Sequence, residues 1–378
     1  MKMHFPPKQN ILILSQNQKF SINVIKCLRY SAHNYFLAGI EHNHKKIKKS
    51  IIFKKFIPTV SDFTELSGED NKVVLQLLSV IDEENIDIVT PSDFESLKFL
   101  SVYKSVLEKT TTVIPLPDIK LIGHLDNKAS CIKFLENTNV ILPKTIIMGD
   151  HNNFDFQLLK TIGFPLIAKS ALGAGGVGIT KIKNQGELDK YLDKCKQDKL
   201  KEEIIIQEYI EGIDYCFYGY AINGMVKAWT LFRYVEFDQN QSKGLFAEFT
   251  NDEKVIETCR EIISYCNYTG PITIDFRKEL KTGLSYFIEI NPRFGYNSSF
   301  SIIDGINFFE VGFELSVNEN FETKPGCNAL WSCSLKRLFS APIRKFDLKS
   351  IYYIFWVGLP QVIFLLKQNR VLIKKIKS

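Results

Sequence analysis

The chain contains two apolar strands that carry polar side chains, Gly270-Pro-Ile-Thr-Ile-Asp275-Phe-Arg277 and Tyr286-Phe-Ile-Glu289-Ile-Asn291-Pro292-Arg293. Because side chains alternate along a strand, Glu289 and Asn291 leave the same face, and Asp275 on the adjacent strand can join them. Two carboxylates and one amide oxygen suit Mg²⁺ that is held together with substrate phosphates. Arg293 continues the same parity and could clamp a carboxylate or a phosphoryl group. The alternative is a hairpin whose polar face meets water, but buried strands rarely carry Glu, Asn and Arg in succession.

A glycine-rich turn lies upstream, within Pro165-Leu-Ile-Ala-Lys169-Ser-Ala-Leu-Gly173-Ala-Gly175-Gly176-Val-Gly178. Glycine lets the backbone approach phosphate oxygens, and its amides can form an anion nest beside the Lys169 ammonium. The turn is no P-loop, because no Gly-Lys-Ser/Thr ends it, and the strand expected after it excludes a dinucleotide fingerprint. Phosphate binding and a mobile hairpin both remain open for this passage.

The passage Ile204-Ile-Ile-Gln207-Glu208-Tyr209-Ile210-Glu211-Gly212-Ile-Asp214 is an apolar strand that ends in acidic residues and a glycine. Its backbone from Glu208 through Tyr209 to Ile210 could hydrogen-bond adenine, and Asp214 could accept from ribose hydroxyls. A strand that ends in a simple acidic turn is the commoner explanation of this pattern.

The first part of the chain alternates short apolar runs with helical patterns. This predicts a parallel sheet with helices on its faces, which binds ligands beyond the carboxyl ends of its strands. The expected strands are 11–15, 35–40 and 86–90, and the expected helices are 22–30, 73–81 and 94–107.

The rest of the chain mixes helices with strands joined by short turns. Asn184 and Glu187 predict a capping box that opens a helix. Asn223-Gly224 predicts a hairpin, because Asn-Gly between apolar runs is the strongest short hairpin signal. The other expected strands are 164–169, 179–182, 203–209, 215–222, 225–234, 272–277 and 285–290, and the other expected helices are 126–136 and 253–266.

Composition places the chain among soluble globular proteins of two or three subdomains, with 378 residues of which 45% are hydrophobic and 24% charged. The net charge of +6 belongs to the tail, since residues 344–378 alone carry +7 and leave −1 for the body. This excludes a broad nucleic-acid surface on the body. The eight cysteines show no CxxC pair, which favours reduced, buried thiols in a cytoplasmic protein.

The C-terminal tail is apolar and aromatic from Ile351 to Leu366 and then basic. As a helix its apolar run would rise about 24 Å, short of the roughly 30 Å of a bilayer core, and Pro360 would break it. Three alternatives stay open: the tail packs on the body, forms a homodimer contact, or makes peripheral contact with an anionic membrane.

Three further passages carry weaker signals. Ser92-Asp93-Phe94-Glu95 is either a substrate-facing loop or, as we favour, a capping box made by Ser92 and Glu95. The run from His42 to Lys49 is interpreted as a solvated basic loop rather than an anion or metal site. Arg233 and Glu236 are candidate pocket residues.

Four of these passages, in this order, resemble the ATP-grasp superfamily, in particular the branch with carbamoyl-phosphate synthase large-chain domains and small carboxylate–amine ligases. They are Asp126-Asn-Lys128, Pro165 to Lys169 with the glycine loop, Gln207 to Asp214, and Asp275 with Glu289-Ile-Asn-Pro-Arg293. The resemblance covers roughly residues 1–315. It departs at Tyr296, where the carbamoyl-phosphate branch carries a second arginine, and this argues against carbamate or carboxyphosphate as the acyl substrate.

The resemblance implies ATP and Mg²⁺ as cofactors, with Mn²⁺ as an alternative ion. It implies that ATP is bound by one set of residues, namely Lys128, Lys169, Gly175, Gly176, Glu208, Tyr209, Ile210 and Asp214. Glu289 and Asn291, with Asp275 as a further ligand, would bind the metal. Arg293 would stabilise an acyl phosphate, so Arg293 and Lys169 are the expected catalytic residues.

The expected architecture is α/β, with a Rossmann-like pre-ATP-grasp domain followed by a two-lobed ATP-grasp fold. The expected bounds are 1–115 for the first domain, 116–320 for the grasp domain with a lid at about 150–203, and 321–378 for the extension. The expected activity is ADP-forming ligation of a small-molecule carboxylate to an amine through an acyl phosphate, in cell-surface sugar modification. The alternatives are a ligase that makes a small peptide or amino-acid conjugate, and an ATP-binding regulatory protein without turnover.

Overall fold

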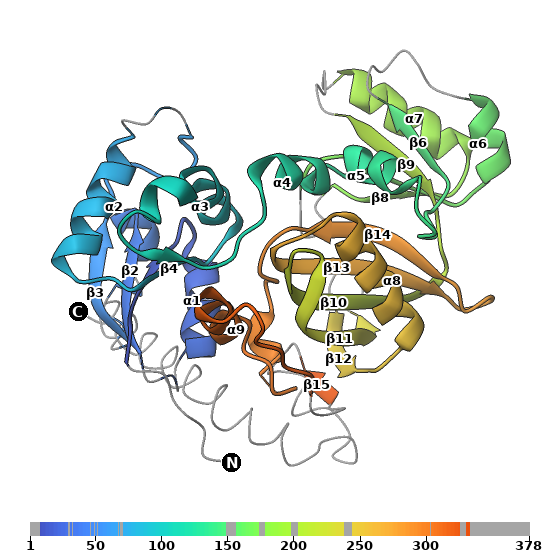
Figure 1. The fold of residues 1–378 in the computed structure, drawn as a ribbon. Coiled ribbons are helices and arrows are strands. Elements are labelled where there is room, and N and C mark those ends of the chain that lie inside the picture. Colours follow the sequence, from blue (N-terminus) through green and yellow to red (C-terminus); the bar gives the residue numbers. More distant parts are fainter. Residues whose placement is uncertain are drawn as a thin grey trace, which may run out of the picture.

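The structure, a computed structural model, has three units (Figure 1). An N-terminal α/β unit lies beside a large antiparallel sheet, and a small third unit stands above that sheet. The structure describes residues 8–332 except 29–30, 32, 46, 49, 51, 67, 69–70, 149–155, 174–177, 198–202, 238–243, 303 and 326–329.

The N-terminal unit is a five-stranded sheet, ordered β3-β2-β1-β4-β5, in which every neighbouring pair is parallel. The interior of β1 and β2 is fully buried because helices cover both faces of a parallel sheet. This confirms the predicted α/β class and the parallel N-terminal sheet. Its elements are β1 (Asn10–Leu14), α1 (Gln18–Leu28), β2 (Asn34–Gly39), η1 (Glu41–His44), β3 (Phe53–Pro58), α2 (Lys72–Glu83), β4 (Ile88–Pro91), α3 (Phe94–Leu107) and β5 (Thr112–Val113).

The interpretation of 42–49 as a solvated loop is wrong for His44. This side chain is buried, its Nδ1 lies 2.8 Å from the carbonyl oxygen of Ile40, and its ring packs against Phe56. The loop folds back over the end of β2 because β3, an edge strand that the sequence pattern did not reveal, lies beside it. Burial of the ring lowers the pKa of His44, so a neutral imidazole is favoured there.

The third unit is an antiparallel four-stranded sheet, ordered β6-β9-β7-β8, with helices α6 and α7. Asn184 caps α7 as predicted, because its side chain accepts from the Glu187 amide at 3.0 Å. The reciprocal half of the predicted capping box is wrong by one residue, because Glu187 accepts from the amide of Lys183, the residue before the cap. The elements are β6 (Thr145–Met148), α6 (Phe156–Ile162), β7 (Leu166–Ser170), β8 (Thr180–Ile182), α7 (Gln185–Gln197) and β9 (Ile204–Glu208).

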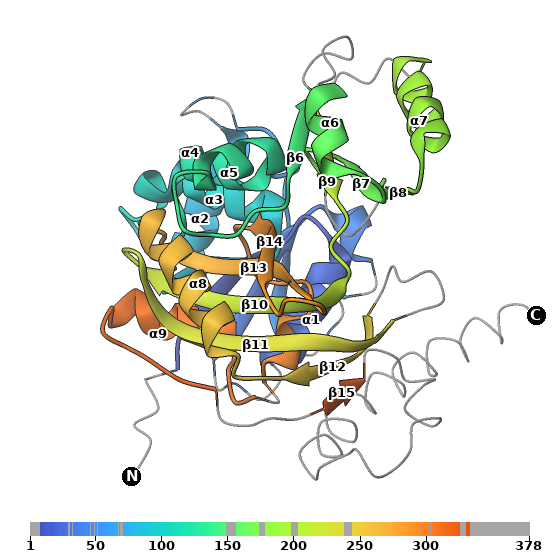
Figure 2. The same ribbon diagram turned by 90° about the vertical axis from the view of Figure 1, so that its right-hand side faces the viewer.

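The large sheet has six strands in the order β14-β13-β10-β11-β12-β15, and Figure 2 shows its long central hairpin. That hairpin turns at Asn223 and Gly224, whose φ angles of 48° and 76° are those of the predicted Asn-Gly turn. The elements are β10 (Gly212–Ile222), β11 (Met225–Phe237), β12 (Gly244–Phe249), α8 (Glu253–Tyr265), β13 (Gly270–Glu279), β14 (Ser285–Asn291), η2 (Ser298–Phe300), α9 (Phe308–Val317) and β15 (Leu330–Ser332).

Two short helices, α4 (Ile119–Asp126) and α5 (Lys128–Leu135), connect the three units (Figure 1). Helix α4 packs against both α3 and β14, and α5 packs against both β14 and β9. The carboxyl end of β14 therefore lies where all three units meet. In the part of the chain that the structure describes, no helix has the length and apolarity needed to cross a bilayer. The six described cysteines are buried, and none of them forms a disulfide.

Candidate functional site

The polar residues of β13 and β14 come together as their strand parity predicts. In the β13–β14 ladder Asp275 lies directly opposite Glu289. The Asn291 amide donates to Glu289 Oε1 at 3.3 Å, and Arg293 Nη2 donates to Asn291 Oδ1 at 2.9 Å. Two carboxylates, an amide and a guanidinium therefore form a continuous row along one edge of the sheet.

Two lysines from different units face this row. Lys128, at the start of α5, lies 3.4 Å from Glu289 Oε2 and also donates to the Gly173 carbonyl oxygen at 2.6 Å. Lys169 on β7 is only 5% exposed, and its burial lowers its pKa to about 8, although the Glu289 carboxylate acts in the opposite direction. Both ammonium groups can neutralise negative charge that enters between the four-stranded unit and the large sheet.

The Asp275 carboxyl group is partly buried and lies beside a second carboxylate, that of Glu289. Burial and then the Glu289 carboxylate raise its pKa to about 7, while a hydrogen bond with Cys216 acts to lower it. Among the described residues no three His, Cys, Asp or Glu side chains form a metal cluster. A divalent cation here would rest on two carboxylates and the Asn291 oxygen together with ligand phosphates, which is a donor set that fits Mg²⁺.

Two of the backbone amides at the end of β9 and just after it already make hydrogen bonds within the protein. The Glu208 amide donates to the Lys144 carbonyl oxygen at 3.0 Å, and the Tyr209 amide donates to the Pro165 carbonyl oxygen at 3.2 Å. The Ile210 amide makes no hydrogen bond to any described residue. Of the backbone donors expected to meet adenine, the Ile210 amide is the one that remains available.

Tyr209 and Asp214 lie beside a single arginine. Asp214 Oδ1 is 3.3 Å from Arg277 Nε, and the Arg277 guanidinium carbon lies 5.4 Å from the centre of the Tyr209 ring. Burial raises the pKa of Asp214, and Arg277 partly opposes that shift. Lys181 Nζ lies 3.4 Å from the same Tyr209 ring centre. Gly175 and Gly176, the expected phosphate-loop glycines, lie outside the described residues.

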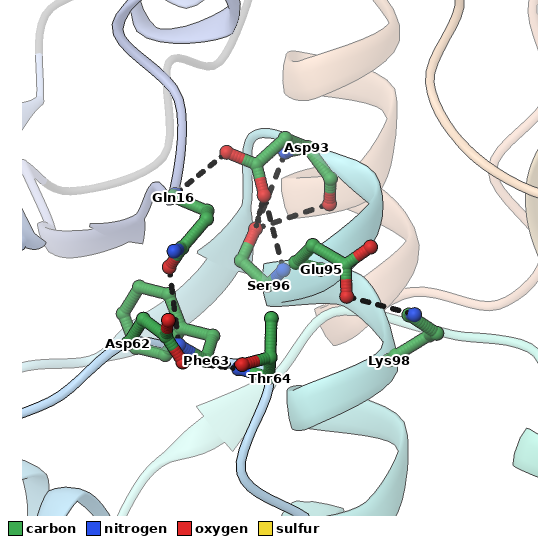
Figure 3. Close-up of polar contacts among 8 residues, drawn as sticks. All are labelled: Gln16, Asp62, Phe63, Thr64, Asp93, Glu95, Ser96 and Lys98. Carbon is green, nitrogen blue, oxygen red and sulfur yellow. Dashed lines mark hydrogen bonds and ion pairs between the residues drawn. The ribbon is translucent and has the colours of Figure 1, made fainter. Parts of the chain in front are cut away.

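Asp93 is the N-cap of helix α3 (Figure 3). Its Oδ1 accepts from the Ser96 amide at 3.0 Å, and its Oδ2 accepts from the Gln16 and Asn17 amides at 2.7 and 2.9 Å. The capping box therefore joins Asp93 to Ser96, and the expected box of Ser92 with Glu95 is wrong by one residue. Glu95 points away from Gln16 and pairs with Lys98 at 2.7 Å.

Arg233 forms an ion pair across the large sheet. Its Nε and Nη2 donate to Glu248 Oε2 at 3.1 and 2.8 Å. The side chain of Glu236, proposed with it as a pocket residue, lies outside the described residues.

Phe20 on α1 enters the site from the N-terminal unit. The Arg293 guanidinium carbon lies 6.0 Å from the centre of its ring, and Tyr296 meets that ring edge-on with centroids 5.4 Å apart. No local sequence signal marks Phe20, because the contact spans almost the whole described chain. Tyr296, which replaces the second arginine of the carbamoyl-phosphate branch, thus lies close to Arg293.

The site and the fold agree with comparisons against known proteins. Residues 125–296 match the family described as the ATP-grasp domain. D-aspartate ligase of Enterococcus faecium (strain Aus0004) is 26% identical over 254 residues, which cover 60% of each chain. The match therefore spans less than two thirds of that ligase.

Solved structures share the fold at low sequence identity. L-amino acid ligase from Bacillus licheniformis matches with a TM-score of 0.63 and 14% identity, over 85% of this chain and 79% of that one. N5-carboxyaminoimidazole synthetase from Staphylococcus aureus matches with a TM-score of 0.63 and 15% identity, over 87% and 83%. Biotin carboxylase from Campylobacter jejuni, solved with beta-gamma-ATP, matches with a TM-score of 0.65 and 15% identity, over 85% and 74%. Residues 125–296 thus match the ATP-grasp domain family, and the chain shares its fold with these solved structures.

Proposed function

We propose that the protein is an ATP- and Mg²⁺-dependent ligase that joins a small-molecule carboxylate to an amine. The observation that carries this proposal is the row of Asp275, Glu289, Asn291 and Arg293 facing two lysines from the lid and α5. Such a row suits transfer of a phosphoryl group, in which the protein acts by positioning and by neutralising charge.

The proposed reaction has two balanced steps. A carboxylate oxygen of the substrate attacks the γ-phosphorus of ATP, the bond to the β-phosphate oxygen breaks, and ADP leaves. The amine nitrogen then attacks the carbonyl carbon of the acyl phosphate, the carbon–oxygen bond to phosphate breaks, and the nitrogen loses a proton.

Each group in the site has a proposed role in this reaction. Lys128 and Lys169 hold ATP phosphates, and the Ile210 amide meets adenine. Asp275, Glu289 and Asn291 would hold Mg²⁺, with Mn²⁺ as the alternative, and the ion when bound supplies positive charge to the phosphates. Arg293 stabilises negative charge on the acyl phosphate.

The two relatives named as amino-acid ligases favour an amino-acid conjugate as the product, in preference to a modified surface sugar. The proposed joining of a carboxylate to an amine does not depend on which of these products is formed. A regulatory protein without turnover is the competing function, and the complete set of metal-ligand and phosphate-facing side chains argues against it.

Phosphorus NMR of a turnover mixture tests the chemistry. The protein is incubated with ATP, Mg²⁺ and pools of carboxylates and amines, and we expect ADP with inorganic phosphate. Formation of AMP with pyrophosphate would disprove the acyl-phosphate route. ADP formation that does not increase when both pools are present would disprove ligation.

We also propose a cytoplasmic location, with peripheral contact between the tail and an anionic membrane. The tail from Ile351 lies outside the described residues, so its basic and aromatic composition alone supports this contact. Flotation with anionic liposomes should carry the full chain but not a chain that ends at Asp347. If both stay in the soluble fraction at low salt, the tail does not bind membranes.

A further inference from the structure

Asp126 occupies the junction between the N-terminal unit and the predicted metal site. It is the last residue of α4, the helix that packs against both α3 and β14 (Figure 1). The two residues that follow Asp126 already have roles, because Asn127 caps α5 by accepting from the Ser130 amide and Lys128 faces Glu289. Asp126 therefore lies at the site without being needed to start the next helix.

An aspartate is unfavourable at this end of a helix. The C-terminus of a helix carries partial negative charge, which disfavours an acidic side chain there. Burial adds to this effect and raises the pKa of Asp126. The stability of the helix therefore does not explain a carboxylate at this position. Binding of a ligand would explain it.

The carboxylate is surrounded by charge but has no partner in the described part of the chain. No described residue makes a hydrogen bond or an ion pair with it. Lys128, Arg293 and Lys98 are nevertheless close enough to favour its charge, and Glu95 is close enough to oppose it. A partly buried carboxylate without a direct partner is costly, and a bound cationic group would remove that cost.

The charges around Asp126 have mixed signs. Arg293 belongs to the predicted acyl-phosphate site, whereas Glu95 and Lys98 pair with each other near the start of α3 (Figure 3). A ligand with a single charge would meet repulsion from part of this set. A zwitterion can place its ammonium at Asp126 and its carboxylate at Arg293.

We propose that Asp126 binds the ammonium group of an amino-acid substrate whose carboxylate faces Arg293. The proposal rests on the ligase function above and adds the chemical class of the acyl substrate. Asp126 thereby selects amino acids over simple carboxylic acids.

Calorimetry on the full chain tests this selection without requiring turnover. Each proteinogenic amino acid, and D-aspartate, is titrated beside its deaminated acid in the presence of Mg²⁺ and a non-hydrolysable ATP analogue. We expect at least one amino acid to bind about tenfold or more tightly than its deaminated acid, as the loss of one charge-assisted contact implies. Asp126→Asn should remove this preference.

Asp118→Asn is the matched control, because Asp118 caps the other end of the same helix and Asn is an equally good cap. This variant should keep the preference, and the ATP analogue should bind all three proteins equally. The proposal is overturned if the wild type prefers no amino acid over its deaminated acid, or if Asp126→Asn keeps the preference. Failure of the ligase function is distinct, because it would appear as ATP turnover that no carboxylate and amine stimulate.

Discussion

Lys169 is an ammonium group placed where its charge is unfavourable until an anion arrives. It lies on β7, 5% exposed, and desolvation lowers its pKa to about 8. The nearby carboxylates of Glu289 and Asp275 act to raise the pKa, but they do not offset the burial. A phosphate bound beside Lys169 would supply the missing negative charge at close range.

We expect ATP affinity, measured without Mg²⁺, to weaken as the pH rises above about 8. Lys169 is protonated below its pKa and loses its charge above it, whereas the phosphates are already almost fully ionised by about pH 8. Calorimetric titrations from pH 7 to 9.5 measure this. Lys169→Met should bind weakly with little pH dependence, and Lys183→Met, an exposed lysine on the same unit, should match the wild type. Equal wild-type affinities at pH 7 and 9.5 would exclude Lys169 from the phosphate site.

Glu289→Ala and Asn291→Ala should each reduce turnover by about 100-fold or more, because each removes an oxygen ligand from the proposed magnesium ion. Circular dichroism and thermal denaturation should show that both variants fold. Glu257→Ala removes an exposed carboxylate from α8 and should keep full activity. Near-normal ATP-dependent ligation by either site variant would show that the metal assignment is wrong.

Strand parity predicts the contacts between Glu289, Asn291 and Arg293, because the three are spaced two residues apart along β14 and its continuation. The contact of Asp275 follows from pairing two strands that are neighbours in sequence. Phe20 and Asp126 could not be predicted in the same way. Their neighbours come from distant segments, and only the packing of α1 against η2 and α9, and of α4 against β14, brings them together.

At the scale of elements, the loop after β14 is held by a close approach between a glycine and an aromatic ring. A Cβ added at Gly295 would lie 2.3 Å from Cζ of Tyr218, a fully buried residue on β10. This loop begins with Arg293 and continues into Tyr296, so the ring of Tyr218 sets the position of both side chains. Glycine is required at position 295 because there is no room for a Cβ beside the Tyr218 ring.

We expect Gly295→Ala to destabilise the fold by about 1–3 kcal/mol, since overpacking in a rigid interior forces a backbone shift. Urea denaturation measures the change, and turnover should fall with it because Arg293 moves. Gly123→Ala, on the exposed side of α4, has no atom within 4 Å of the new Cβ, so it should be neutral or stabilise by about 0.5–1 kcal/mol. Unchanged stability and turnover for Gly295→Ala would mean that Tyr218 does not hold the loop.

Elements with strong local signals follow the sequence pattern closely. Helix α3 has its predicted bounds, and the Asn223-Gly224 hairpin turns where expected. The edge strand β3 escaped prediction because its burial neither alternates nor forms an apolar run: Phe53 and Ile57 are buried, and two exposed lysines follow Phe53. The capping box of α3 was misplaced because Ser92 and Asp93 are both good cap residues, and only the amides that approach Asp93 distinguish them.

At the scale of the whole molecule, the hydrophobic core is divided unevenly. One cluster joins the N-terminal sheet to α9 and to one face of the large sheet, so these two units share a core. A second cluster lies between α8 and the other face of the large sheet. The four-stranded unit has a small core of its own, built from residues such as Leu166, Leu188 and Ile206. A fourth, smaller cluster of Ala129, Ile132, Ala171 and Ile205 joins this unit to α5. Because most of its core is separate from the other two, we propose that the unit moves as a lid about that contact.

Hydrogen exchange followed by mass spectrometry should resolve this division. In nucleotide-free protein, peptides from β6 to β9 should exchange faster than those from β1, β10 and β13, because a small core gives little protection against local opening. Addition of Mg²⁺ with a non-hydrolysable ATP analogue should slow exchange mainly in the four-stranded unit, where Lys169 and the Ile210 hinge face the nucleotide. The strands of the N-terminal sheet should change little and serve as the internal control. Equal protection of β7 and β13 before nucleotide is added would contradict an independently mobile lid, and ATP would then have to enter a site that is already closed.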